Sequence, residues 1–117
     1  MSGSNARYRA PFEIQVERRG ETAFIRLRGE FDLASEKEFK DQLRLAGLGE
    51  LRELVFDLTE LSFIDSTGLR MILEQWNNSR RDGPDLSILP VTGQVQRVFA
   101  VAGLDEVLPF RDGKPSH

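Results

Sequence analysis

Apolar residues along this chain follow two different periods, and the change from one to the other separates strands from helices. Every second residue is apolar over 12–16 and again over 22–29, with Gly20 in the turn between them. This alternation predicts two half-buried strands that form an antiparallel hairpin. The continuous apolar run 54–58 predicts a strand buried on both faces, and a short fourth strand is expected at 86–89.

Three other segments have helical spacing, in which apolar residues recur at i, i+3, i+4 and i+7. Ser35 and Glu38 predict a capping box at the start of the first helix. The second helix is expected from Leu69 to about Arg80, and the third is expected to begin near Thr92. The predicted buried positions of the second helix are Leu69, Ile72, Leu73 and Trp76.

The predicted order is therefore strand, strand, helix, strand, helix, strand, helix. Strands that are separated by a helix pair in parallel through right-handed crossovers. We expect one small α/β domain over 11–111, with a mixed sheet made of the N-terminal antiparallel hairpin plus parallel strands, and with helices packed on it. Residues 29–33 and the stretch before Ser66 are expected to be loops. Residues 1–10 and 112–117 are expected to be flexible tails.

Length, charge and cysteine content narrow the classes of function. A chain of 117 residues is one domain by size, and its net charge of −3 disfavours nucleic acid and anionic lipid as partners. No apolar stretch reaches the roughly 18 residues that a membrane span needs, so no membrane insertion is expected. The absence of cysteine excludes disulfides and thiolate chemistry and fits the reducing cytoplasm. We expect a cytoplasmic monomer.

The residues offer little for catalysis. His117 is the only histidine and stands at the C-terminal end, and no glycine-rich phosphate loop of the Walker or dinucleotide type occurs. Asp57 suggests a receiver-type phosphoaspartate, but that chemistry also needs an acidic pair near the first strand and a lysine on a late strand. Because neither is present, we interpret Asp57 as a carboxylate that anchors a loop. We expect that the protein is not an enzyme and that it binds no metal ion and no cofactor.

The run Asp65-Ser66-Thr67-Gly68 lies at the predicted start of the second helix. Helix N-termini present unpaired backbone N–H groups and the positive end of the macrodipole, so a phosphate is well stabilised there. A glycine inside the first turn costs about 0.5–1 kcal/mol of stability relative to alanine. Its presence indicates that another group approaches the backbone closely here, or that a side chain would block access to the site. We therefore hypothesise that Ser66 is a reversible phosphorylation switch. The alternative is that the run is a plain helix cap.

The predicted outer face of the same helix carries Arg70, Met71 and Glu74. Met71 is expected to be exposed, and a pliable apolar side chain at the surface suits a partner contact. Partial burial of Met71 is the alternative. Arg70 and Glu74 either contribute to the same surface or form an ordinary i, i+4 ion pair.

Several segments resemble the STAS domains, specifically the bacterial anti-sigma factor antagonists. The main match is Phe63-Ile64-Asp65-Ser66-Thr67-Gly68-Leu69, preceded by Val55-Phe56-Asp57-Leu58. Gly29-Glu30-Phe31-Asp32 resembles the family's loop after the second strand. Residues 95–99, followed by Gly103-Leu104, resemble its late helix. The resemblance extends over nearly the whole expected domain and implies the STAS fold.

The resemblance also implies a function and the residues that perform it. In that family an anti-sigma factor, which is also an ATP-dependent serine kinase, phosphorylates the position that falls on Ser66. The unphosphorylated antagonist binds this kinase and frees its sigma factor, and a PP2C-type phosphatase reverses the modification. Asp32 corresponds to an aspartate near the phosphoacceptor. The expected partner-binding residues are Asp32, Asp65, Thr67, Gly68, Arg70 and Met71.

A phosphate on Ser66 would add about −1.5 to −2 charges beside Asp32 and Asp65. We expect this charge to repel the partner locally without refolding the protein. Arg70 stands where some relatives carry a small residue, a departure that bears on partner choice. The alternative function is a STAS scaffold without a switch, such as an accessory subunit of a lipid-transport ABC system or part of a stress-sensing complex. A domain of a sulfate transporter is disfavoured because membrane segments are absent.

Overall fold

The computed structural model describes residues 10–47 and 50–111, so the expected tails lie almost wholly outside it. Its elements, in chain order, are β1 (Glu13–Arg19), β2 (Thr22–Phe31), the 3-10 turn η2 (Leu33–Ser35), α1 (Glu36–Leu45), β3 (Glu53–Ile64), α2 (Ser66–Arg81), β4 (Asp85–Ile88) and α3 (Gly93–Val101). The sheet order is β1-β2-β3-β4. β1 pairs antiparallel with β2, whereas β2, β3 and β4 are mutually parallel. The predicted mixed α/β sheet is confirmed.

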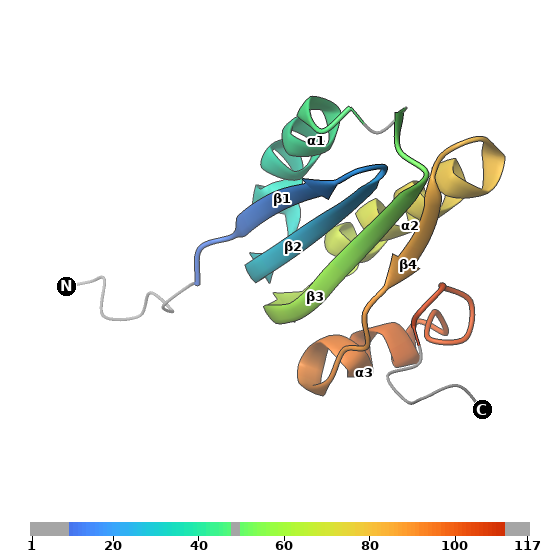
Figure 1. The fold of residues 1–117 in the computed structure, drawn as a ribbon. Helices are drawn as coiled ribbons and strands as arrows, with labels where there is room; N and C mark the ends of the chain where they lie inside the picture. Colours follow the sequence, from blue (N-terminus) through green and yellow to red (C-terminus); the bar gives the residue numbers. More distant parts are fainter. Residues whose placement is uncertain (1–9, 48–49, 112–117) are drawn as a thin grey trace.

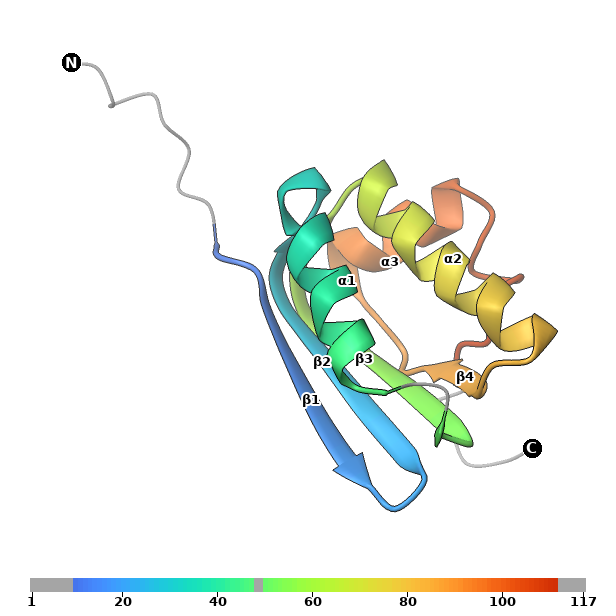
Figure 2. The ribbon, with the colours of Figure 1, turned by 90° about the horizontal axis from the view of Figure 1, so that it is seen from above.

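The helices cover one face and one end of the sheet. α1 connects β2 to β3 and α2 connects β3 to β4, and both cross the same face (Figure 1; Figure 2). α3 packs against β3 near its carboxyl end. No helix in the described ranges combines the length and the apolar character needed to cross a bilayer.

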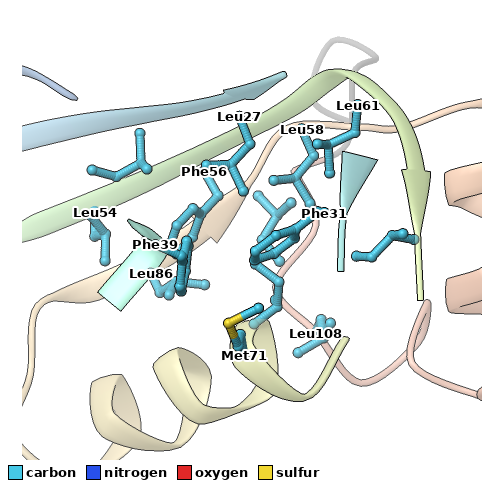
Figure 3. Packing of buried hydrophobic residues seen from close by; sticks show 14 of the residues in the cluster. Leu27, Phe31, Phe39, Leu54, Phe56, Leu58, Leu61, Met71, Leu86 and Leu108 are labelled. Atoms are coloured by element: carbon cyan, nitrogen blue, oxygen red, sulfur yellow. The ribbon is translucent and has the colours of Figure 1, made fainter. Parts of the chain in front are cut away.

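The hydrophobic core lies between the sheet and helices α1 and α2 (Figure 3). Alternate residues of the central strands point into it, as the period of two requires. Three aromatic rings, Phe31, Phe39 and Phe56, follow one another through this core, with the first two ring centroids 4.9 Å apart. On the opposite face Val55 is still buried, but Asp57 beside it forms an ion pair with Arg26 at 3.3 Å. Burial on both faces was therefore predicted correctly for only part of this strand.

β2 and β3 are longer than predicted. β2 continues to Phe31 and β3 to Ile64, through stretches that were expected to be loops. The register between them shifts twice, and each shift breaks the alternation of apolar and polar side chains that signals a strand. Asp57 supports the first shift, because its carboxylate accepts hydrogen bonds from the Thr59 backbone N–H at 3.0 Å and from the Thr59 hydroxyl at 2.6 Å. Asp57 thus anchors an irregular strand.

The predicted capping box of α1 is wrong. Ser35 occupies the N-cap position but makes no side-chain cap bond. Its buried hydroxyl instead donates to the Glu30 carbonyl oxygen at 2.9 Å and accepts from the Asp32 backbone N–H at 3.3 Å. The capping box is formed one turn earlier, by Asp32 and Ser35 around η2. Ser35 is drawn inward because it holds the chain where it leaves β2.

Gly29 permits a close approach of two backbone segments. It has a φ of +85°, and a Cβ there would lie 1.9 Å from the Pro11 carbonyl oxygen. We predict that Gly29→Ala lowers the free energy of unfolding, measured in urea, by clearly more than Gly20→Ala. Gly20 also has a positive φ but nothing within 4 Å of its Cβ position, so its substitution costs only the roughly 1–2 kcal/mol of backbone strain. Equal losses would contradict this role for Gly29.

Candidate functional site

The site is built where β2 and β3 end side by side. Phe31 and Ile64 are register partners, and the Asp65 backbone N–H donates to the Phe31 carbonyl oxygen at 3.3 Å. Asp32 and Asp65 therefore follow paired residues at the same edge of the sheet. Both have extended backbone conformations and both accept hydrogen bonds from the turn that follows them. The predicted proximity of Asp32 to the start of the second helix follows from this pairing.

Asp65, rather than Ser66, caps α2. The Asp65 carboxylate accepts a hydrogen bond from the Gly68 backbone N–H at 3.0 Å. Ser66 is the first residue of the helix and is exposed. Because a carboxylate already satisfies the donor that a capping hydroxyl would bind, the helix start does not need the Ser66 hydroxyl. The Asp-Ser-Thr run thus contains both a cap and an accessible serine.

Gly68 is a packing residue. It is buried, and a Cβ there would lie 2.7 Å from both the Ile64 side chain and the Phe31 carbonyl oxygen. The sequence indicated that something approaches this glycine closely, and the structure identifies the approaching group as the end of the protein's own sheet. The expectation that Gly68 contributes to an open surface is wrong. Thr67, beside it, is partly buried.

The predicted exposure of Met71 is also wrong. Its side chain is 0% exposed and points from α2 into the core (Figure 3). The buried positions of this helix are Gly68, Met71 and Ile72, which shifts the buried face away from the predicted stripe. The absence of a side chain at position 68 lets that side of the helix approach the strands. The predicted residues Leu69, Leu73 and Trp76 are only partly buried, at the margin of the core.

Asp32 is largely inside, with 8% of its surface exposed. Its carboxylate accepts from the Ala34 backbone N–H at 3.1 Å and lies 3.3 Å from the Ser35 hydroxyl oxygen, so it shapes η2. The large apolar side chain that this turn presents to solvent is that of Leu33, which is 67% exposed. Sequence reasoning missed Leu33. Its signal was a large apolar residue, directly after a capping aspartate, that belongs to no strand or helix stripe.

Arg70 joins the two helices beside the site. Its guanidinium contacts the Glu74 carboxylate at 2.9 Å, as the i, i+4 spacing predicted, and also the Glu36 carboxylate at 3.4 Å. Glu36 and then Glu74 raise the pKa of Arg70 above its ordinary value. The pKa of Glu36 is lowered, chiefly by the hydrogen bond from Lys40 at 2.9 Å; burial opposes this effect, and the hydrogen bond from Arg70 adds to it. The link between Arg70 and Glu36 was missing from the sequence-based expectations.

Within the described ranges, no group of three or more histidine, cysteine, aspartate or glutamate side chains is arranged to hold a metal ion. A chemically distinctive feature of this edge is the exposed serine that forms the first residue of α2. The first two turns of α2, counted from its cap, bring together three polar groups: the Asp65 carboxylate, the Ser66 hydroxyl and the Arg70 guanidinium.

The chain belongs to the STAS domain family, whose model matches residues 13–115. It is similar to the anti-sigma-B factor antagonist of Listeria monocytogenes, with 27% identity over 84 residues that cover 72% of this chain and 74% of the relative. It is also similar to the anti-sigma F factor antagonist of Paenibacillus polymyxa, with 26% identity over 103 residues that cover 87% and 88% of the two chains.

Among solved structures, the fold is similar to that of the anti-sigma factor antagonist SpoIIAA. The unphosphorylated form matches with a TM-score of 0.71 and 25% identity, over 87% of this chain and 89% of the other. The phosphorylated form from Bacillus matches with a TM-score of 0.67 and 24% identity, over 87% and 92% of the two chains. The resemblance to STAS domains noted in the sequence is confirmed.

The division of roles between Asp65 and Ser66 can be tested by equilibrium unfolding. We predict that Asp65→Ala lowers the free energy of unfolding by about 1 kcal/mol, because the Gly68 N–H loses its acceptor. Asp65→Asn retains an acceptor and should lose much less. Ser66→Ala should stay within about 0.5 kcal/mol of the wild type. A loss at Ser66 as large as that at Asp65 would show that the serine is structural.

Proposed function

We propose that this protein is an anti-sigma factor antagonist controlled by phosphorylation of Ser66. In its unphosphorylated form it binds an anti-sigma factor that is also a serine kinase, and the bound sigma factor is released. Phosphate on Ser66 ends the interaction, and a PP2C-type phosphatase restores it. The observation that carries the proposal is the exposure of Ser66. Its hydroxyl is not needed as the helix cap, because the Asp65 carboxylate already accepts the hydrogen bond from the Gly68 backbone N–H. The names of the relatives support the general role.

The electrostatics of the site favour a local effect. A phosphate would bring about −1.5 to −2 charges to the first residue of α2. The backbone N–H groups of the first turn and the helix dipole stabilise such a charge, so the fold should tolerate it. A partner that packs against a neutral hydroxyl would instead have to bury a charge. A loss of roughly 4 kcal/mol of binding free energy corresponds to about a thousandfold in affinity.

The proposed docking surface surrounds Ser66 and combines Leu33 from η2 with Arg70 from α2. Leu33 supplies an exposed apolar side chain, and Arg70 supplies an exposed charge. Asp32 and Asp65 act mainly by shaping the two turns that present these groups. Met71 and Gly68 are left out because they are buried. The protein would act as a binding partner without catalysis of its own, as a monomer, in the cytoplasm with its sigma factor.

The central test is capture of partners from an extract of the source cell. Wild type should capture an ATP-binding kinase and, on addition of ATP, gain one phosphate, located at Ser66 by mass spectrometry. Ser66→Ala should still capture the kinase but gain no phosphate, and Ser66→Asp should capture little because it carries a negative charge at the contact. This series separates the loss of the hydroxyl from the gain of charge.

Two outcomes would contradict the proposal. Equal capture by wild type and Ser66→Asp would reject the switch, and phosphate found only on Thr67 would reject the assignment of the residue. Capture of a membrane ATPase with Ser66 unmodified would instead favour the alternative, a STAS scaffold without a switch.

The docking surface makes a separate prediction about Leu33. Leu33→Ala should weaken binding of the captured kinase about tenfold, because burying a leucine side chain contributes about 1.5–3 kcal/mol and a loss of about 1.4 kcal/mol is tenfold in affinity. Leu45→Ala is the matched control. Leu45 is 76% exposed, but it is the last residue of α1, whereas Leu33 lies shortly before the first residue of that helix. Titration calorimetry would measure both. An equal effect of the two substitutions, or none at Leu33, would place the partner elsewhere.

A further inference from the structure

Arg70 stands one helical turn after Ser66 on the exposed side of α2. Residues at i and i+4 of a helix have Cβ atoms about 5–6 Å apart. Helical side chains also lean toward the N-terminus of their helix, so the turn that Arg70 naturally covers is the turn that contains Ser66. A phosphate at position 66 would therefore lie within reach of this guanidinium.

The present partners of Arg70 hold it weakly and in the less favourable direction. Its side chain is 49% exposed, and exposed ion pairs contribute little to stability. In the pair with Glu74, the cation precedes the anion along the helix. The reverse order, with the anion four residues before the cation, is the more stabilising one because it agrees with the helix dipole.

The other partner, Glu36, does not depend on Arg70. The Lys40 ammonium contacts the same Glu36 oxygen at 2.9 Å, against 3.4 Å for the Arg70 guanidinium. If Arg70 turned away, Glu36 would keep a cation beside it. Release of Arg70 from α1 therefore leaves no unpaired carboxylate at this position.

We propose that Arg70 is a phosphate-binding residue that exchanges its carboxylate partners for a phosphate on Ser66. A phosphoserine offers about twice the charge of Glu36 or Glu74 and three acceptor oxygens, which suit the forked donors of a guanidinium. To meet the phosphate, the Arg70 side chain turns away from Glu74 and toward the N-terminal end of the helix. Ser66 and Glu74 are eight residues apart, about 12 Å along the helix axis, on opposite sides of Arg70.

The exchange changes more of the surface than the phosphate alone. In the unphosphorylated protein Arg70 ties α1 to α2 through Glu36. In the phosphorylated protein that tie is absent, the new charge is partly neutralised, and Glu36 is paired with Lys40 alone. This proposal rests on the proposed modification of Ser66. It adds that the phosphate is held by the protein's own arginine.

The test installs the phosphate without any kinase. Phosphoserine is placed at position 66 during translation by an expanded genetic code, and its second ionisation is followed by 31P NMR as a function of pH. A neighbouring guanidinium favours the dianion, so the phosphate pKa in Arg70→Gln should be higher than in the wild-type background by about 0.5 pH unit. Arg70→Lys, which keeps the charge but not the fork, should fall between the two.

Arg81→Gln is the matched control. It removes one positive charge from the same helix, but at a position fifteen residues from Ser66, or about 22 Å along the helix axis. Its phosphate should titrate as in the wild type to within about 0.1 pH unit. A second readout is the side-chain Nε–Hε NMR signal of Arg70, identified by its loss in Arg70→Gln, which should shift when residue 66 changes from serine to phosphoserine.

Equal phosphate pKa values in the wild type and Arg70→Gln, or an equal shift in Arg81→Gln, would overturn the role of Arg70. Neither result depends on a cellular kinase. Failure of this proposal is therefore distinguishable from failure of the proposed function, which the capture experiment tests. Circular dichroism and urea unfolding of each variant would establish that the compared proteins are folded.

Discussion

The contact between Gly68 and the backbone of Phe31 determines how α2 meets the end of the sheet. A Cβ at position 68 would lie 2.7 Å from the Phe31 carbonyl oxygen, so a residue with a side chain would push the helix start outward. The close approach brings Met71 and Ile72 into the core. The opposite side of the helix then faces solvent, and Ser66 lies on that side. The exposure of Ser66 is thus a consequence of how Gly68, two residues further along the chain, packs against the sheet.

The order of elements could be predicted because most strands and helices keep one apolar face, and the two periods differ. The lengths of β2 and β3 could not. Their last residues, Phe31 and Ile64, lie beyond two register shifts that interrupt the alternation of side chains. The pairing there depends on the neighbouring strand, which no local pattern encodes. These last pairs are the ones that bring Asp32 and Asp65 to the same edge.

The candidate site, like the fold, could be predicted only in part. A short polar run before an amphipathic stretch indicates a helix start, so Ser66 was correctly placed there. Which residue caps the helix, and which side of the helix is buried, were decided by tertiary structure. The apolar arc of α2 is wide enough for two overlapping stripes, and Gly68, which selects between them, has no hydrophobic side chain to signal this. The contact of Arg70 with Glu36 joins residues 34 positions apart, beyond any helical period.

The separation of cap and hydroxyl has a physical consequence for any modification of Ser66. If the serine itself capped α2, a phosphate would alter the bond that starts the helix, and phosphorylation would be coupled to local stability. With Asp65 as the cap, the bond to the Gly68 N–H has no reason to change. The added charge then acts outward, on Arg70 and on whatever approaches the surface. A junction of this kind allows the charge at one surface point to change while the fold that presents it stays the same.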